Sequence, residues 1–179
     1  MSDKDKTTET DELLVESEEE HLENKYLLCK LADEVYGINI RDVTDIIELQ
    51  KITEVPDMPE YVKGVINLRG QVIPVIDLRL RFGMQPHEYD DRTVITVVNV
   101  RDNSVGFIVD TATEVEDIPD KNIDPPPKFQ GQWQSQGLGQ AGQDKPVEKK
   151  YIAGLGKIGE QVTILLDTEE LVSEAEVRM

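Results

Sequence analysis

The chain of 179 residues carries a formal net charge of -18, with 31% charged and 38% hydrophobic residues, and its pI is near 4.4. A chain this acidic is poorly suited to neutralising phosphate groups, which argues against nucleic acid and direct membrane binding. It has no apolar run near the ~20 residues of a spanning helix and no signal-peptide core, and its one cysteine, Cys29, allows no internal disulfide. We therefore expect a cytoplasmic protein, built as one domain or as two small ones that share a core.

The N-terminal stretch is an acidic tail. Residues 1–24 are dominated by Asp, Glu, Ser and Thr, with few apolar side chains. Such a segment buries too little apolar surface to offset the entropy that ordering would cost, so we expect it to be disordered. We assign it no function.

An internal repeat follows the tail. Strand-like segments separated by turns begin at Tyr26. A shift of 69 positions places residues 26–46 on 95–115 without a gap, and Gly37 then coincides with Gly106. A match at turn glycines as well as in strands is not expected from chance alignment of aliphatic residues.

The second half of the unit repeats at a different spacing. A shift of 90 positions places Gly64 on Gly154, and the surrounding strand-like residues also coincide. The sequence therefore predicts two copies of one all-β unit, each with about five short strands that closure into a barrel would protect. We expect the first barrel over about 36–90, with strand exchange, and the second over about 93–167.

Two short helices and a long loop are expected outside the strands. The difference between the shifts, 90 minus 69, leaves 21 extra residues in the second copy, within a Gln- and Gly-rich stretch that predicts a mobile loop at 125–150. Asp77 and Asp167 each open a capping pattern typical of a short helix, the second one near the C-terminus. Residues 172–179 are expected to form a C-terminal tail.

A hydrophobic hairpin in the first copy presents an arginine. Two apolar runs flank a turn at Gly70, with Arg69 at the tip. The first copy reads Asn-Leu-Arg-Gly at 67–70 where the second reads Lys-Ile-Gly-Glu at 157–160, so the hairpin can close without arginine. Two roles stay open for Arg69: an ion pair with Asp45, or contact with a partner through its planar guanidinium.

The chain lacks the residue clusters that catalysis or cofactor binding requires. His21 and His87 have no second His or Cys at metal-ligand spacing, and no Gly-rich phosphate loop is present. We therefore predict no enzymatic activity, no catalytic residue, no metal and no cofactor. Lys63, Arg79 and Arg81 make one region locally basic, which we interpret as a solvated face in preference to a binding patch.

Short motifs occur in a fixed order along the chain: Tyr-Gly-Ile at 36–38, Val-Pro at 55–56, Asn-Leu-Arg-Gly at 67–70, Pro-Val-Ile-Asp-Leu-Arg at 74–79 and Phe-Gly at 82–83. Together they resemble the CheW-like chemotaxis coupling proteins, over about residues 25–171. The resemblance implies two SH3-like five-stranded β-barrels packed side by side, in agreement with the internal repeat.

The resemblance also implies a function, that of a non-enzymatic adaptor. Proteins similar to this one couple the cytoplasmic tips of chemoreceptors (methyl-accepting chemotaxis proteins) to the regulatory domain of the histidine kinase CheA, in membrane-associated signalling arrays. The positions that match the family's kinase-binding surface are Val43, Asp45, Ile46, Gly64 and Val65. The positions that match its receptor-binding groove are Ile40, Val94 and Val115. Arg69 matches the family's characteristic arginine, and Asp45 stands where an acidic residue, commonly Glu, is usual.

Other classes of protein fit the sequence less well than an adaptor, and one alternative pathway stays open. A nucleic-acid-binding barrel would need a basic groove with stacking aromatic residues, whereas this chain is acidic and only 5% aromatic. The chemotaxis protein CheV joins a similar domain to a receiver, for which 179 residues leave no room. A CheW-like scaffold in a non-flagellar two-component pathway stays open. Without the resemblance, plain core positions are the simpler interpretation of the three receptor-matching aliphatic residues.

Overall fold

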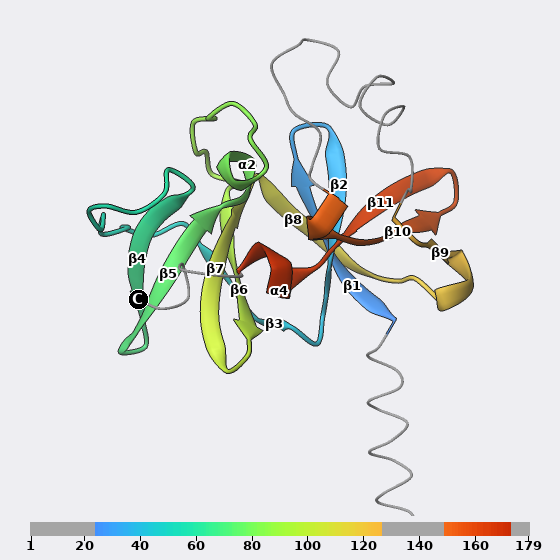
Figure 1. Cartoon of the computed structure of the whole chain (residues 1–179), viewed down its shortest axis with the longest axis horizontal. Coiled ribbons are helices and arrows are strands. Elements are labelled where there is room, and N and C mark those ends of the chain that lie inside the picture. Colours follow the sequence, from blue (N-terminus) through green and yellow to red (C-terminus); the bar gives the residue numbers. More distant parts are fainter. Residues whose placement is uncertain (1–23, 127–148, 173–179) are drawn as a thin grey trace, which may run out of the picture.

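The computed structural model describes residues 24–126 and 149–172, which are almost entirely β-structure (Figure 1). The strands are β1 (Lys25–Leu31), β2 (Glu34–Asn39), β3 (Val43–Glu48), β4 (Val62–Leu68), β5 (Gln71–Asp77), β6 (Val94–Val100), β7 (Asn103–Val109), β8 (Thr111–Asp117), β9 (Ile123–Asp124), β10 (Ile152–Ile158) and β11 (Gln161–Leu166). The helices are α2 (Leu78–Arg81), α4 (Thr168–Leu171) and 3-10 turns at Asp120–Asn122 and Lys149–Tyr151.

The predicted tails and loop lie mostly outside the described residues. This holds for the acidic tail at 1–24, the loop at 125–150 and the C-terminal tail at 172–179. One boundary needs correction, because Val172 is only 2% exposed and forms the C-cap of α4. Its apolar side chain gains more from the core than from solvent, so the folded part extends one residue further than expected.

The strands form two mixed sheets, which lie side by side in Figure 1. The five-stranded sheet has the order β3-β6-β7-β5-β4, and the six-stranded sheet has the order β8-β1-β2-β11-β10-β9. Within each sheet one pair is parallel, β5 with β7 and β11 with β2, and the other pairs are antiparallel. The all-β class with short helices is therefore confirmed, and the sixth strand is the two-residue β9.

The two sheets repeat one arrangement, with their first hairpins exchanged. Val75 lies opposite Gly106 in the five-stranded sheet, and the equivalent Leu165 lies opposite Gly37 in the six-stranded sheet. The hairpin β1–β2 thus joins strands of the second copy, and β6–β7 joins strands of the first. The expected division at about 36–90 and 93–167 allowed for strand exchange, and the exchanged strands are β2, in the six-stranded sheet, and β6 and β7, in the five-stranded sheet. Both copies offer the same edges and register, so sequence similarity alone cannot say which copy a hairpin pairs with.

Each sheet closes on itself through the segment that follows its outer strand. After β3 the chain reaches Thr53, whose backbone exchanges two 2.8 Å hydrogen bonds with Val65 on β4. After β8 it reaches β9, where Asp124 lies opposite Leu155 on β10. The two edges of each sheet are therefore connected, as expected for small barrels.

Equivalent threonines fill equivalent bulges on the two outer strands. The register of β3 on β6 shifts next to Thr44, whose Oγ1 donates to the Val97 carbonyl at 3.2 Å. The register of β8 on β1 shifts at the same place in the repeat, where Thr113 Oγ1 donates to the Leu28 carbonyl at 3.3 Å. Each hydroxyl donates to a carbonyl of the neighbouring strand at the bulge, which is a physical reason for threonine at both positions of the repeat.

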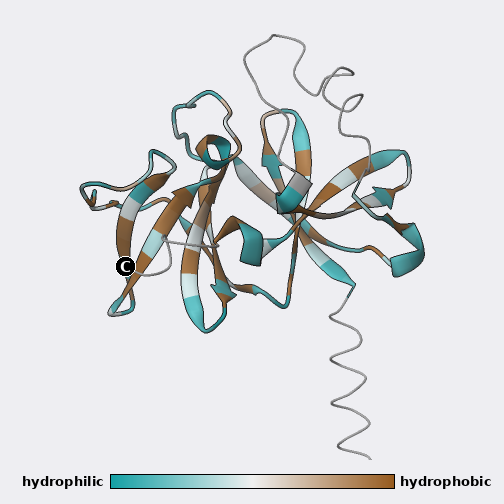
Figure 2. Cartoon of the chain, in the orientation of Figure 1, coloured by the Kyte–Doolittle hydropathy of each residue, from teal (hydrophilic) through white to brown (hydrophobic). Residues whose placement is uncertain are grey.

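The core runs across both sheets. The main cluster of buried side chains contains residues from each of them, and a smaller cluster centred on Ile66 and Ile95 lies within the five-stranded sheet. Hydrophobic residues occupy the inner parts of the strands, and hydrophilic residues occupy most hairpin ends (Figure 2). Phe82, just after α2, stacks on Tyr36 with ring centroids 5.6 Å apart and makes a tilted ring contact with Tyr151, with centroids 5.9 Å apart. These rings belong to β2 and to the turn before β10, so α2 is packed against the six-stranded sheet.

Candidate functional site

The tip of the β4–β5 hairpin holds Arg69 in a strained backbone conformation. Arg69 has φ 52° and Gly70 has φ 85°, and the Gly70 amide donates to Asn67 Oδ1 at 2.9 Å. The left-handed region costs a residue with a Cβ roughly 1–2 kcal/mol, and only glycine enters it freely. At the equivalent position the second copy has Gly159 with φ 59°. The arginine is therefore kept at a position where glycine would be easier to fold.

Arg69 contacts an aspartate on the opposite edge of the sheet. Arg69 Nη2 lies 3.0 Å from Asp45 Oδ2, and the two side chains are 80% and 23% exposed. Asp45 Oδ1 accepts from the Ile46 amide at 3.0 Å, whereas Oδ2 is buried and accepts no hydrogen bond from the described residues. The contact is therefore an electrostatic attraction without hydrogen-bond geometry. One of the two roles left open for Arg69 by the sequence, an ion pair with Asp45, is therefore present.

The five kinase-matching positions lie on β3 and β4, the two edges of the five-stranded sheet. Ile46 is 44% exposed, and Val43 and Val65 are half-buried. Gly64 is buried with φ 141°, and a Cβ there would lie 2.0 Å from the Thr53 carbonyl oxygen. The closing contact with Thr53 thus accounts for the glycine, without any need for a binding role. Ile46 and Arg69 are the exposed side chains of this surface.

The three receptor-matching positions are divided between the sheets. Val94 opens β6 in the five-stranded sheet and is half-buried, whereas Val115 lies on β8 of the six-stranded sheet and is 46% exposed. Ile40 follows β2, is half-buried, and its amide donates to the Lys25 carbonyl at 3.0 Å. Ile40 and Val94 pack against the main core. The shape of any surface that includes Ile40, Val94 and Val115 therefore depends on the angle between the two sheets.

Exposed apolar side chains occur in equivalent pairs. Ile46 and Val115 occupy the same position in the two copies, at 44% and 46% exposure. Val72 and Val162, at 66% and 51%, occupy another equivalent pair at the starts of β5 and β11. Sequence reasoning did not assign a role to the second pair. The available signal was a β-branched residue two or three positions after a turn glycine in both copies.

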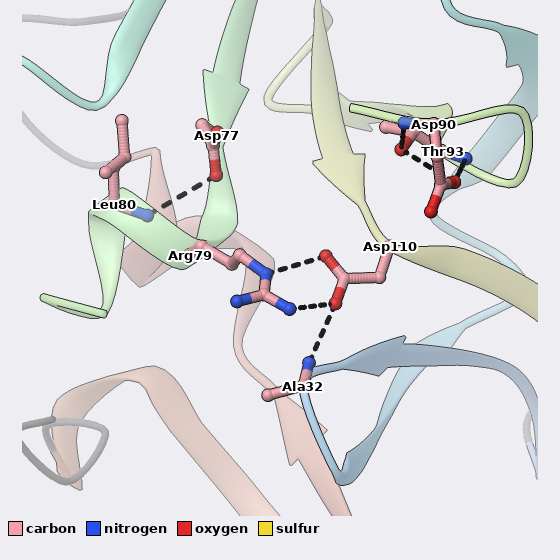
Figure 3. Close-up of polar contacts among 7 residues, drawn as sticks. All are labelled: Ala32, Asp77, Arg79, Leu80, Asp90, Thr93 and Asp110. Atoms are coloured by element: carbon pink, nitrogen blue, oxygen red, sulfur yellow. Dashed lines mark hydrogen bonds and ion pairs between the residues drawn. The ribbon is translucent and has the colours of Figure 1, made fainter. Parts of the chain in front are cut away.

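The interpretation of Arg79 and Arg81 as part of a solvated face is wrong. Arg79 Nε donates to Asp110 Oδ1 at 2.7 Å, and its Nη2 donates to Asp110 Oδ2 (Figure 3). Arg81 lies over the rings of Tyr61 and Tyr151, 4.3 and 4.9 Å from their centroids. Both side chains extend from α2 to distant parts of the chain, which local sequence cannot reveal.

The contacts of Asp110 with Arg79 and Ala32 change the pKa of its carboxyl group. Burial raises the pKa of the Asp110 carboxyl, but the hydrogen bonds from Arg79 and from the Ala32 amide outweigh burial and hold it below its ordinary value.

Asp77 and Asp167 act as the predicted helix caps, accepting from the Leu80 amide at 3.4 Å and from the Glu170 amide at 3.2 Å.

Comparison with known proteins decides the family. The model of the CheW-like domain matches residues 25–176, which is most of the chain. The chain belongs to the CheW-like family. The matched span includes both sheets and both candidate surfaces, so the resemblance noted in the sequence is confirmed. Within the described part of the chain, no helix is long and apolar enough to cross a membrane.

Named relatives of this CheW-like chain agree with the assignment. It is 34% identical over 155 residues to the chemotaxis protein CheW of Klebsiella aerogenes, covering 87% of this chain and 85% of the relative. It is 32% identical over 144 residues to the chemotaxis protein CheW of Helicobacter pylori, covering 80% and 78%. It also matches the solved scaffolding protein TtCheW of Thermoanaerobacter tengcongensis, with a TM-score of 0.73, 30% identity and coverage of 87% and 97%. By family, the protein is a non-enzymatic chemotaxis scaffold.

Proposed function

We propose that the protein bridges chemoreceptor tips and the regulatory domain of the histidine kinase CheA, in the cytoplasm at membrane-associated arrays. The kinase binds the edge of the five-stranded sheet, formed by Val43, Asp45, Ile46, Gly64, Val65 and Arg69. The receptor tip binds the surface shared by both sheets, formed by Ile40, Val94 and Val115. The protein carries out no reaction itself and needs no cofactor.

The presence of Arg69 at a left-handed turn position where the second copy has Gly159 is the observation that carries the proposal. Strain that the fold does not need is commonly found at functional positions. The hairpin closes with Gly159 in the second copy, so closure of the turn does not require Arg69. Its ion pair with Asp45 does not explain it either, because the Arg69 side chain is 80% exposed and ion pairs open to solvent on one side contribute only ~0–1 kcal/mol. A contact between Arg69 and a binding partner accounts for the arginine at this position.

The surface around Arg69 has the composition of a protein interface. Ile46 is exposed next to Asp45, and Arg69 extends over the same edge with 80% of its side chain accessible. An exposed aliphatic residue beside an arginine can anchor a partner that offers an apolar pocket and a carboxylate. Asp45 holds the guanidinium near this edge before binding, which reduces the entropy lost on association.

Val115 gives the receptor surface its accessible apolar group. It is exposed on β8, which pairs only with β1 among the described strands, and it faces no neighbouring strand on its outer side. The tip of a receptor is a helical hairpin, and a helix can place apolar side chains against such an edge. Two modest interfaces of this kind, repeated in an array, supply avidity.

Amide NMR titration with the regulatory domain of CheA from the same organism tests the proposal. We expect saturable shifts over 43–46 and 64–69, with none at the equivalent segments 112–115 and 154–159 of the second copy. The second copy thus serves as an internal control of matched structure. No saturable shifts at high concentration, or shifts confined to the second copy, would remove the kinase assignment. Binding to a kinase of another two-component pathway instead would favour a scaffold outside flagellar chemotaxis.

A further inference from the structure

One residue marks the point where the chain passes from one sheet to the other. β7 ends at Val109 in the five-stranded sheet and β8 begins at Thr111 in the six-stranded sheet, which leaves Asp110 as the only residue between them. The Asp110 amide donates to the Lys30 carbonyl at 3.0 Å. Its carboxylate accepts from the Ala32 amide at 2.8 Å, at the turn between β1 and β2. Asp110 is therefore bound to the six-stranded sheet by both its backbone and its side chain.

Arg79 connects the same carboxylate to the five-stranded sheet. Arg79 lies in α2, which directly continues β5, and its guanidinium binds both oxygens of Asp110 (Figure 3). The two side chains are only 15% and 26% exposed. A two-point contact between planar groups fixes their relative orientation as well as their distance, and partial burial protects it from screening by salt.

A second attachment lies on α2 beyond the first. The Arg81 guanidinium lies over the rings of Tyr61 and Tyr151, and its Nε donates to the Leu171 carbonyl at 3.3 Å. Tyr151 and Leu171 belong to the elements before β10 and after β11. Arg79 and Arg81 thus fix α2 to the six-stranded sheet, in addition to the ring contacts of Phe82 with Tyr36 and Tyr151. Of these contacts, the Arg79–Asp110 pair is the one made at the residue where the chain passes between the sheets.

We propose that the junction of Arg79, Asp110 and Ala32 sets the angle between the two sheets, and with it the shape of the surface that the sheets share. Val94 lies on one sheet and Val115 on the other, so a change in the angle moves them relative to each other. The kinase-matching positions lie on the five-stranded sheet alone and would move together. Arg79 and Asp110 are then positioning residues for the receptor surface only, an assignment that rests on the proposed function.

Residual dipolar couplings of the backbone amides test the junction without any partner. In the unmodified protein, couplings from both sheets should fit one alignment tensor with the relative orientation seen in the structure. In Arg79→Gln we expect each sheet to fit by itself, while the joint fit fails or requires a changed angle. Asp110→Asn, whose side-chain oxygen can still accept from the Ala32 amide, should show a smaller change. Arg101→Gln is the matched control, because it removes the ion pair of Arg101 with Glu169, whose side chains are 75% and 61% exposed.

A joint fit in Arg79→Gln that is unchanged from the unmodified protein would overturn the junction. The selective effect on partners is measured separately, with receptor-tip and kinase regulatory domains. We expect Arg79→Gln to weaken receptor binding roughly threefold to tenfold, the size typical of residues that act on a site indirectly, with kinase binding unchanged. An equal loss of affinity for the receptor tip and for the kinase domain would contradict the assignment of Arg79 and Asp110 to the receptor surface. If the unmodified protein binds neither partner, the proposed function fails, while the dipolar couplings still decide on the junction.

Discussion

Arg69 Nη2 lies 3.0 Å from Asp45 Oδ2, and this contact joins the tip of the β4–β5 hairpin to β3 at the opposite edge of the same sheet. Because Arg69 is 80% exposed on its side chain, the pair should add little to folding stability. A double-mutant cycle with Arg69→Glu and Asp45→Lys should give a coupling of about 0.2–1 kcal/mol in denaturant unfolding. A coupling well above that range would mean that the pair has a structural role, and the argument from excess strain would fail.

The strain at Arg69 can be measured by comparing two truncations. Arg69→Gly and Arg69→Ala both remove the guanidinium, but only glycine relieves the left-handed backbone. We expect Arg69→Gly to be more stable than Arg69→Ala by about 1 kcal/mol, and Gly159→Ala to lose about the same amount. Both Arg69 variants should bind the kinase domain more weakly than the unmodified protein. Equal stability of the two truncations would show that the turn is not strained.

Closure of the five-stranded sheet depends on the absence of a side chain at Gly64. A Cβ at this position would meet the Thr53 carbonyl oxygen at 2.0 Å, so Thr53 would have to leave Val65. We expect Gly64→Ala to cost about 3 kcal/mol or more in unfolding free energy, or to prevent folding. Gly70→Ala is the control, because φ is also positive but no atom lies within 4 Å of its Cβ. Its cost should stay near ~1 kcal/mol, from backbone strain alone.

The charge state of Asp110 predicts how its mutation responds to pH. Hydrogen bonds from Arg79 and the Ala32 amide outweigh burial and hold its pKa below the ordinary value. Its ionised form therefore adds stability above the unfolded pKa of about 3.9, and this contribution is lost as the pH falls through the folded value. Asp110→Asn should be less stable than the unmodified protein at neutral pH, with the deficit shrinking as the pH falls below about 4.

Asp42 provides a control, because the pKa of its carboxyl is shifted in the opposite direction to that of Asp110. Burial raises the pKa of Asp42. The hydrogen bond from Thr168 and the charge of Arg41 partly offset this increase, and the carboxylates of Glu169 and Asp167 add to it. Its ionised form is therefore destabilising, and Asp42→Asn should be more stable than the unmodified protein at neutral pH, with the gain shrinking on acidification. Denaturant midpoints across the acid range measure both variants. The same pH trend for the two would contradict the assigned causes.

The internal repeat was readable from sequence because it is carried by residues with strict backbone or packing needs. Gly37 and Gly106 sit where a Cβ would approach a neighbouring side chain to 2.8 and 2.7 Å, and Thr44 and Thr113 fill equivalent bulges. The hairpin exchange was not readable in detail. Equivalent strands have equivalent registers, so the choice of partner depends on the three-dimensional course of the chain.

The candidate site was only partly predictable. The contact of Arg69 with Asp45 was one of two roles considered, and the difference from the second copy singled it out. The contacts of Arg79 and Arg81 were missed, because their partners Asp110, Tyr61, Tyr151 and Leu171 are distant in the sequence and local charge suggested solvent exposure. The exposure of Val72 and Val162 was missed for a similar reason, since alternation alone does not tell which face of a strand a second sheet covers.

Ile46 and Val115 are equivalent side chains with different proposed partners, and this difference can be measured directly. Ile46→Ser and Val115→Ser remove aliphatic groups of 44% and 46% exposure from the same position of the two copies. Affinities of both variants for the CheA regulatory domain and for a receptor tip would be measured by titration calorimetry. We expect Ile46→Ser to weaken kinase binding about tenfold with receptor binding unchanged, and Val115→Ser to show the reverse. Loss of the same partner in both variants, or no loss in either, would contradict the separation of the two surfaces.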